Sequence, residues 1–373
     1  MRRTGTSPVT DHRWMARALQ LAREGLYTTQ PNPRVGCVIV RDGEVVGEGF
    51  HPRTGQPHAE VFALRQAGER ARGATAFVTL EPCAHFGRTP PCAEALIAAG
   101  VARVVMAGLD SNPLVGGKGR QMLEAAGIAT ATGVLEAEAQ VLNPGFLRRM
   151  AGGIPWVRLK MAGSLDGRTG MPSGESKWIT GPDARRDVQK WRAMSSAIIT
   201  GIGTVLADDP ALDIRPEEWT GWHYGEPVQP WRVILDSRLR TPLTAKVLKA
   251  NTKVIVVASP DADDGRAQAL TALGAEVWRL PHGDLPGLLQ RLAAQGANEV
   301  LVEAGATLAG AFLQAGVVDE LVLYLAPTLL GSLGRPLMAL PIEHMAGQKR
   351  LDIRDVRNIG ADIRILARPA AQA

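Results

Sequence analysis

Hydrophobic and polar positions follow two kinds of periodicity along the first half of the chain. Apolar residues spaced three and four apart predict helices over Asp11–Glu24, His58–Arg70, Pro91–Ala99 and Gln121–Ala126. Short apolar runs bounded by turn residues predict strands over Gly36–Arg41, Glu44–Glu48, Thr75–Leu80, Val101–Ala107 and Ala129–Val134. The first two strands are expected to form a hairpin around Asp42-Gly43. Strands that alternate with helices indicate an α/β domain.

A break in this pattern separates the two halves of the chain. Glycine and proline cluster between Pro144 and Pro155, and we place there the linker between a domain of residues 1–147 and a domain of residues 148–373. Helices are predicted over Pro182–Ala193 and Leu308–Ala315. Strands are predicted over Trp156–Ala162, Ala197–Thr200, Arg232–Asp236, Lys253–Ala258, Glu276–Arg279, Glu299–Glu303 and Asp319–Ala326. The second half is therefore a second α/β domain.

Composition and charge narrow the classes of partner. The net charge of +5 is spread along the chain without a block of like charges, which suits phosphorylated metabolites at least as well as nucleic acid. Aromatic residues are only 5% of the chain, so stacking platforms for bases are scarce and we expect no nucleic-acid partner. The start of the chain does not resemble a secretory signal, and the longest apolar run, near Leu321–Leu330, is too short to span a bilayer. We expect a soluble cytoplasmic protein with no membrane partner.

One histidine, one glutamate and two cysteines form a candidate metal centre. The three cysteines of the chain are an odd number, which favours metal ligands or catalysts over disulfides. His58, Cys83 and Cys92 would supply three ligands to zinc and leave the fourth position to water, as a catalytic zinc requires. Zinc lowers the pKa of such a water, and Glu60 could carry its proton to a departing amine.

The spacing of the two cysteines leaves alternatives open. Zinc deaminases commonly carry a pattern in which two residues separate the cysteines, whereas eight separate Cys83 from Cys92. A structural zinc with His85 as a fourth ligand, or two unconnected buried cysteines, would also fit. Cys37 lies in an apolar strand and is expected to be a buried core thiol.

The second half carries two glycine-containing turns after strands. Thr200–Thr204 (TGIGT) and Glu303–Thr307 (EAGAT) could each bring backbone amides to a dinucleotide phosphate. No G-x-G-x-x-G fingerprint is present. Each segment could equally be a tight strand-to-helix turn.

Long stretches of the chain carry the motifs of a known family. PNPRVGCVIV (Pro31–Val40), HAEV (His58–Val61) and PCAHFGRTPPC (Pro82–Cys92) resemble the deaminase domain of the bifunctional riboflavin-biosynthesis deaminase/reductases, and the eight-residue gap is that family's own spacing. Four further segments resemble the reductase domain of that family. They are KMAGSLDGRTG (Lys160–Gly170), SGESKWIT (Ser173–Thr180), TGIGTVLADDPAL (Thr200–Leu212) and Val302–Pro327. Gly163 and Gly170 stand where alanines are expected, a change that removes no functional group.

The resemblance implies a cytidine-deaminase-like N-terminal domain followed by a dihydrofolate-reductase-like C-terminal domain. It implies that His58, Cys83 and Cys92 bind Zn²⁺ and that Glu60 is the catalytic proton carrier. The residues implied to line the deaminase substrate site are Asn32, His51, His85, Arg88, Asp110 and Asn112. From the residues alone, these could instead be turn formers, a surface histidine or a solvated arginine.

In the reductase domain the resemblance implies contacts with NADPH and with the sugar phosphate. The implied NADPH contacts are Ala162, Trp178, Thr204, Asp208, Ser237 and a loop formed by Gly305, Ala306, Thr307, Leu308, Ala309, Gly310 and Ala311. The implied substrate contacts are Ser176, Arg192, Leu212, Arg215 and Glu303. Arg192 could instead lie on a solvated helix face, and Trp178 could be a core residue. Asp208 is the residue considered as general acid of the reduction.

The implied reactions are consecutive steps on one small phosphorylated pyrimidine. The first domain removes the 2-amino group of 2,5-diamino-6-ribosylamino-4(3H)-pyrimidinone 5′-phosphate by hydrolysis. The second reduces the ribosyl group of the product to ribityl with NADPH, giving 5-amino-6-ribitylamino-uracil 5′-phosphate. A homo-oligomer, dimer or tetramer, is expected. The alternatives are a nucleoside or nucleic-acid deaminase with an accessory domain, and a zinc-stabilised ligand sensor.

Overall fold

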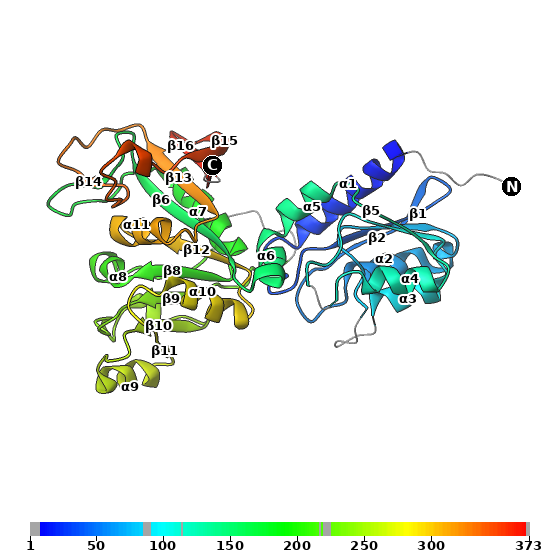
Figure 1. The fold of residues 1–373 in the computed structure, drawn as a ribbon, viewed down its shortest axis with the longest axis horizontal. Helices are drawn as coiled ribbons and strands as arrows, with labels where there is room; N and C mark the ends of the chain where they lie inside the picture. The colour runs from blue at the N-terminus through cyan, green and yellow to red at the C-terminus, as the bar shows by residue number, and fades with distance from the viewer. Residues whose placement is uncertain (1–7, 85–90, 113–114, 216–217, 219–224, 371–373) are drawn as a thin grey trace. The chain divides into compact units, whose positions relative to one another are not determined.

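The computed structural model describes residues 8–84, 91–112, 115–215, 218 and 225–370. Their contacts divide the chain into two compact units that part between Gly153 and Ile154 (Figure 1). Among the helices of these residues, none is long and apolar enough to cross a membrane.

A five-stranded mixed sheet forms the centre of the first unit, in the order β2-β1-β3-β4-β5. β1 (Gly36–Arg41) runs antiparallel to both β2 (Glu44–Phe50) and β3 (Thr75–Val78), while β3, β4 (Arg103–Met106) and β5 (Ala129–Thr132) are parallel. Asp42 and Gly43 both have positive φ, which is the geometry of a two-residue hairpin turn. The helices are α1 (Pro8–Glu24), α2 (Ala59–Ala67), α3 (Cys92–Ala99), α4 (Lys118–Ala125), α5 (Glu136–Leu142) and α6 (Pro144–Gly152).

Alternate residues of the strands pack against helices on the two faces of this sheet. Cys37 and Ile39 belong to a core with residues of α2, α3 and α4, whereas Val38 and Val40 pack with residues of α1 and α5. Cys37 is fully buried, which confirms the expected core thiol. The face covered by α2 and α3 is the one that carries the predicted metal ligands.

The second unit is built on a nine-stranded sheet in the order β11-β10-β9-β8-β12-β6-β13-β16-β15. The first seven strands are parallel, and β16 and β15 add an antiparallel edge. The strands are β6 (Trp156–Ser164), β8 (Ala197–Gly201), β9 (Trp231–Leu235), β10 (Val254–Ala258), β11 (Glu276–Arg279), β12 (Glu299–Glu303), β13 (Glu320–Ala326), β15 (Leu351–Ile359) and β16 (Asp362–Pro369). A separate ribbon pairs β7 (Arg168–Gly170) with β14 (Arg335–Pro336).

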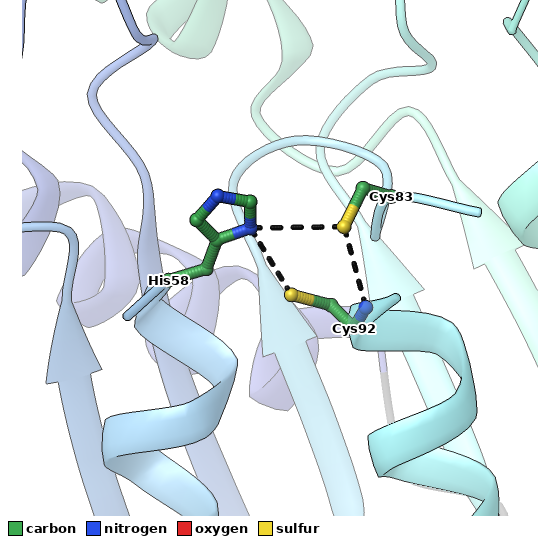
Figure 2. A group of neighbouring side chains, drawn as sticks. All are labelled: His58, Cys83 and Cys92. Atoms are coloured by element: carbon green, nitrogen blue, oxygen red, sulfur yellow. Dashed lines mark hydrogen bonds between the residues drawn. The ribbon is translucent and has the colours of Figure 1, made fainter. Parts of the chain in front are cut away.

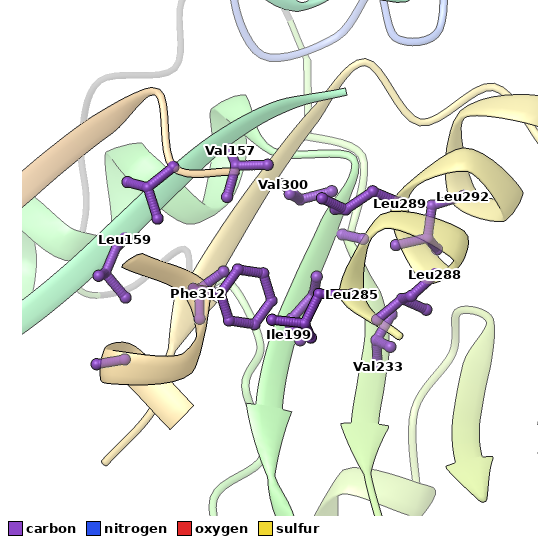
Figure 3. Packing of buried hydrophobic residues seen from close by; sticks show 14 of the residues in the cluster. Val157, Leu159, Ile199, Val233, Leu285, Leu288, Leu289, Leu292, Val300 and Phe312 are labelled. Carbon is purple, nitrogen blue, oxygen red and sulfur yellow. The ribbon is translucent and has the colours of Figure 1, made fainter. Parts of the chain in front are cut away.

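Helices cover both faces of this sheet. On one face, α10 (Leu285–Ala294) and α11 (Ala306–Gln314) bury Leu288, Leu289 and Phe312 against strand residues such as Val157 and Val300 (Figure 3). The other face packs with α7 (Pro182–Met194), α8 (Ile202–Asp208) and α9 (Asp264–Ala272). Because the strands are buried on both sides, they appear in the sequence as continuous apolar runs.

The structure differs from several predictions of local structure. The two units part between Gly153 and Ile154, inside the stretch predicted as the linker, but the first part of that stretch forms helix α6, which begins at Pro144, a residue suited to the first turn of a helix. Residues 306–311, which the resemblance implied as part of a cofactor loop, are the first turns of α11, whose start the apolar pattern placed two residues later at Leu308; only Gly305 precedes the helix. The prediction omitted α5, α8, α9, α10 and the β15–β16 hairpin.

Candidate active sites

The three predicted zinc ligands come together in the first unit. His58 directly precedes α2, Cys92 is the first residue of α3, and Cys83 lies in the segment after β3 (Figure 2). His58 Nδ1 lies 3.2 Å from Cys92 Sγ and 3.6 Å from Cys83 Sγ. The ligand atoms all lie within 4.8 Å of one another, so one ion can touch all three.

Electrostatics of this cluster favour metal binding. Hydrogen bonding from Cys92 and His58 lowers the pKa of the Cys83 thiol, and the backbone N–H of Cys92 also donates to Cys83 Sγ at 3.3 Å. The pKa of Cys92 is raised, because its thiol is hydrogen-bonded to Cys83 and buried. The lowered pKa favours the thiolate form of Cys83, which is the form that ligates zinc. An imidazole and two thiols suit zinc and leave one tetrahedral position for water.

Glu60 lies in the first turn of α2, two residues after His58. Its side chain is buried, and its Oε2 has no hydrogen-bond partner in the described part of the chain. Burial raises the pKa of Glu60 above its ordinary value. A buried carboxyl with an unpaired oxygen beside the metal ligands is suited to proton transfer.

Asn32 and His51 lie next to the metal ligands, because the His51 ring contacts the His58 ring and Asn32 is hydrogen-bonded to His51. His51 Nδ1 lies 3.0 Å from the carbonyl oxygen of Pro57, and since a carbonyl only accepts, Nδ1 carries the proton. His51 Nε2 then accepts from Asn32 Nδ2 at 3.1 Å. The His51 ring is only 2% exposed and meets the His58 ring edge-on, so it is not a surface histidine.

Asp110 and Asn112 lie beyond the end of β4 and are held by a residue that the sequence analysis missed. The buried carboxylate of Glu81 accepts the backbone N–H groups of Asp110, Gly117 and Arg120 at 3.1, 2.9 and 3.0 Å. Asp110 Oδ1 in turn accepts the N–H of Asn112 at 2.8 Å. The other two predicted substrate contacts, His85 and Arg88, lie outside the described residues.

The predicted sugar-phosphate contacts of the second unit include a buried ion pair. Arg192, near the end of α7, donates from Nε and Nη2 to the two carboxylate oxygens of Glu303 at 2.7 and 3.0 Å. Its Nη1 donates to the backbone oxygen of Asp213 at 2.8 Å. The side chains of both Arg192 and Glu303 are 12% exposed, so Arg192 is not on a solvated helix face.

Lys160 joins this pair and was not predicted as a site residue. It is the register partner of Glu303 on the adjacent strand β6. Burial lowers the pKa of Lys160, an effect that Glu303 only partly offsets. Burial opposes the ionisation of Glu303, but Arg192, Lys160 and Arg215 outweigh it and hold the pKa of Glu303 below its ordinary value. Arg192, Lys160 and Arg215 thus all stabilise the Glu303 carboxylate, and guanidinium groups are well suited to binding a phosphate.

The remaining predicted substrate contacts of this unit differ in exposure. Arg215 is half-exposed and pairs with Glu218 at 2.6 Å. Ser176 is exposed. The Leu212 side chain is buried in the core, with a positive φ of 52°, so only its backbone can meet a ligand.

The predicted cofactor contacts gather mainly around the carboxyl ends of the parallel strands. Gly201 is the last residue of β8, Gly305 follows the adjacent strand β12, and each directly precedes a helix. Ser237 follows β9, and Ala162 lies near the end of β6. Thr204 and Asp208 belong to α8, and Asp208 pairs with Lys177 at 3.4 Å. Trp178 is 73% exposed with Arg185 stacked on its ring, so it is not a core residue.

Comparison with known proteins identifies the family. The model of the RibD C-terminal domain matches residues 155–365, and that of the cytidine and deoxycytidylate deaminase zinc-binding region matches residues 8–108. The riboflavin biosynthesis protein RibD of Escherichia coli is 52% identical over 360 residues, which cover 95% of this chain and 98% of that protein. The chain belongs to the RibD family.

Solved structures of RibD proteins share this fold over nearly the whole chain. The Acinetobacter baumannii RibD structure is 54% identical with a TM-score of 0.92, covering 98% of this chain and 100% of that one. A Thermotoga maritima diaminohydroxyphosphoribosylaminopyrimidine deaminase/5-amino-6-(5-phosphoribosylamino)uracil reductase is 32% identical with a TM-score of 0.84, covering 97% and 99%.

Membership of the RibD family confirms the predicted fold classes and the two kinds of activity. The N-terminal unit is cytidine-deaminase-like and the C-terminal unit is a dihydrofolate-reductase-like reductase domain. The chain is a deaminase and a reductase of riboflavin biosynthesis, with Zn²⁺ and NADPH as cofactors and a small molecule as substrate. Residues 8–108, which match the zinc-binding region of the deaminase model, include His58, Cys83 and Cys92.

Proposed function

We propose that residues 1–147 deaminate 2,5-diamino-6-ribosylamino-4(3H)-pyrimidinone 5′-phosphate and that residues 148–373 reduce the ribosyl group of the product. The observation that carries the first step is the convergence of His58, Cys83 and Cys92 beside the buried carboxyl of Glu60. The observation that carries the second is the cluster of Lys160, Arg192 and Glu303 near the carboxyl ends of the parallel strands, where ligands bind in α/β sheets.

In the deaminase unit, His58, Cys83 and Cys92 would hold Zn²⁺, which when bound supplies an activated water. Glu60 Oε2 would accept a proton from the attacking water and would pass it to the departing amine. One water is consumed, a carbonyl replaces the amino group, and ammonia leaves. The raised pKa of Glu60 suits this exchange because the carboxyl must both take and give a proton near neutral pH.

The pyrimidine would be held by Asn32, Asp110 and Asn112, with His85 and Arg88 as further proposed contacts. His51 accepts from the amide of Asn32 and thereby fixes how that amide is turned. Its own tautomer is fixed by the carbonyl of Pro57.

In the reductase unit, NADPH supplies a hydride when bound. Its proposed contacts are Ala162, Trp178, Thr204, Asp208, Ser237 and the residues from Gly305 to Ala311. Arg192 and Arg215, with Ser176, Leu212 and Glu303, would hold the sugar phosphate. A proton must accompany the hydride, and we assign it to Lys160 Nζ rather than to Asp208. Burial lowers the pKa of Lys160, whereas Asp208 is exposed and pairs with Lys177.

A two-signal assay tests this proposal. Zinc-loaded protein is given the diamino substrate and NADPH, and ammonia release and NADPH absorbance are followed in one cuvette. We expect ammonia first and NADPH oxidation after it. Ammonia without NADPH oxidation would contradict the reductase step, and no ammonia from protein shown to contain zinc would contradict the deaminase step.

We further propose that the protein is a homo-oligomer. β15 is an edge strand that pairs on one side with β16, and it exposes the apolar side chains of Ile353 and Val356. An edge of this kind is suited to pairing with a second copy of the chain. Sedimentation of the wild type against the Ile353→Lys variant tests this, and a wild-type monomer would contradict it.

The cellular location and the absence of a nucleic-acid partner are also proposals. Two neighbouring cysteines that must stay reduced to bind zinc are better preserved in a reducing compartment, which supports a cytoplasmic location. The positive charges of the reductase site surround one buried carboxylate and do not form a surface stripe, which supports a small phosphate ligand over nucleic acid. Deamination of oligonucleotides would contradict this view.

A further inference from the structure

A buried carboxylate connects the metal-ligand segment to the neighbouring loop of the deaminase unit. Glu81 precedes Pro82 and Cys83, and its side chain is only 7% exposed. Its Oε2 accepts from the N–H groups of both Asp110 and Gly117, and its Oε1 accepts from that of Arg120. Three backbone donors satisfy a charge that would otherwise be costly to bury.

The same carboxylate caps helix α4. The N-cap residue of α4 is Gly117, which has no side chain to accept the first N–H groups of the helix. Glu81 supplies those acceptors from a segment 36 residues away in sequence. The N-terminal end of α4 and the segment that ends in Cys83 are therefore held by one side chain.

Close backbone packing shows that this junction has little room to shift. A Cβ on Gly119 would lie 2.0 Å from the carbonyl oxygen of Pro82, and a Cβ on Gly116 would lie 2.5 Å from that of Asp110. Neither position can accept a side chain without moving backbone. The loop is also closed on itself, because the N–H of Gly116 donates to the carbonyl of Asn112 at 2.8 Å.

We propose that Glu81 is a positioning residue that sets the distance between the zinc-ligating Cys83 and the substrate-binding loop of Asp110 and Asn112. This inference rests on the proposed function of that loop. Glu81 accepts hydrogen bonds from the backbone of Asp110, Gly117 and Arg120, and it therefore acts on the substrate-binding loop through these backbone groups. Its loss leaves the cysteines in place, since Cys83 is held separately by the N–H of Cys92, and frees the loop.

Two substitutions at Glu81 separate positioning from general stability. Glu81→Ala removes all three acceptors. Glu81→Gln keeps one oxygen, which can still accept from Asp110 and Gly117, but turns an NH₂ group toward the N–H of Arg120. Glu81→Ala should raise the deaminase KM about tenfold or more, with kcat little changed and zinc content the same. Glu81→Gln should restore the wild-type KM. Glu124→Ala, on the exposed face of the same helix, is the matched control and should leave KM unchanged.

Amide hydrogen exchange gives a readout that does not depend on the substrate. Exchange should become faster at Asp110, Gly117 and Arg120 in Glu81→Ala, and only at Arg120 in Glu81→Gln. Reduction of deaminated substrate by the same samples should be unchanged and reports their active concentration.

The outcomes distinguish this inference from the proposed function. If the wild type releases no ammonia, the proposed function is contradicted. The amide hydrogen exchange pattern still tests whether Glu81 holds the backbone of Asp110, Gly117 and Arg120. Active wild type with an unchanged KM in Glu81→Ala overturns the inference. A parallel fall of activity and zinc content in both variants also overturns it, because that result shows a structural role alone.

Discussion

The buried pair of Arg192 and Glu303 gives a prediction whose size follows from the structure. Substitution of Arg192 by methionine removes two charged hydrogen bonds to Glu303, of 2.7 and 3.0 Å, and leaves the carboxylate with Lys160 as its nearest cation. Removing one partner of a buried ion pair costs about 3–5 kcal/mol in free energy of unfolding. We expect the Arg192→Met variant near the lower value, because Lys160 still compensates the charge of Glu303.

Substitution of the other partner, Glu303→Gln, should lower the free energy of unfolding at least as much. It leaves Arg192 and Lys160 in a poorly solvated site without their main counter-charge, because Asp213 and Glu218 act on Arg192 less strongly than Glu303 does. The double variant should be destabilised by less than the sum of the two single variants, because it leaves no unpaired charge between these two positions. Large losses in the single variants and a smaller combined loss indicate a buried ion pair. A surface ion pair would contribute only about 0–1 kcal/mol to the free energy of unfolding.

Urea unfolding followed by tryptophan fluorescence measures these free energies. The signal reports mainly the second unit, whose described tryptophans are Trp156, Trp178, Trp191, Trp231 and Trp278, whereas Trp14 is the described tryptophan of the first unit. If both single variants unfold within about 1 kcal/mol of wild type, the pair is solvated and the reasoning fails. Strictly additive effects in the double variant would also refute it.

Three further predictions test the two sites and the core separately. Glu60→Gln should lower the rate of ammonia release about 10²–10⁴-fold while zinc content and the reduction of deaminated substrate stay unchanged; loss of both activities would contradict two independent sites. Removal of zinc by a chelator should abolish ammonia release and spare NADPH oxidation with deaminated substrate, and re-addition of zinc should restore the first activity. Hydrogen bonds from Tyr324 and Arg364 outweigh burial and lower the pKa of Asp187, so its stabilising effect is complete above about pH 4 and is lost as the pH falls through the folded-state pKa. The free energy of unfolding of Asp187→Asn should therefore lie below wild type at pH 7 and approach it in acid, and a constant difference would assign the effect to packing.

How much of the fold the sequence predicts depends on burial. β8, predicted as Ala197–Thr200, extends over Ala197–Gly201, because strands buried on both faces appear as apolar runs. β15 was missed because most of its side chains are exposed and show no alternation. Helices α9 and α10 do carry a local signal, since Asp263 and Asp284 each cap a first turn. An aspartate before a helical stretch is therefore a sequence signal for the start of both helices.

The candidate sites divide in the same way between local and long-range information. Glu60 lies two residues from His58, so the sequence alone indicates that both can reach one metal-bound site. Glu81 and Lys160 were missed because their partners lie far along the chain. Glu81 holds backbone groups 29–39 residues away, and Lys160 meets Glu303 only because β6 and β12 are adjacent. A residue type carries no sign of such a role until the sheet order is known.

Arg192 and Glu303 show why a correct list of site residues still falls short of a mechanism. The resemblance implies both as separate substrate contacts, but each is the other's main partner in the structure. Three N–H groups of Arg192 are already engaged, by Glu303 and by the carbonyl of Asp213, so a phosphate would meet only the remaining edge of its guanidinium. A rise in KM after Arg192→Ala would therefore mix lost phosphate contact with a displaced Glu303. Arg192→Lys separates the two effects, because it keeps a charge for the phosphate and loses the two-point contact with Glu303. If the KM of Arg192→Lys matches that of wild type, a positive charge alone is enough to bind the phosphate. If it matches that of Arg192→Ala, the substrate requires the two-point contact by which Arg192 orients Glu303.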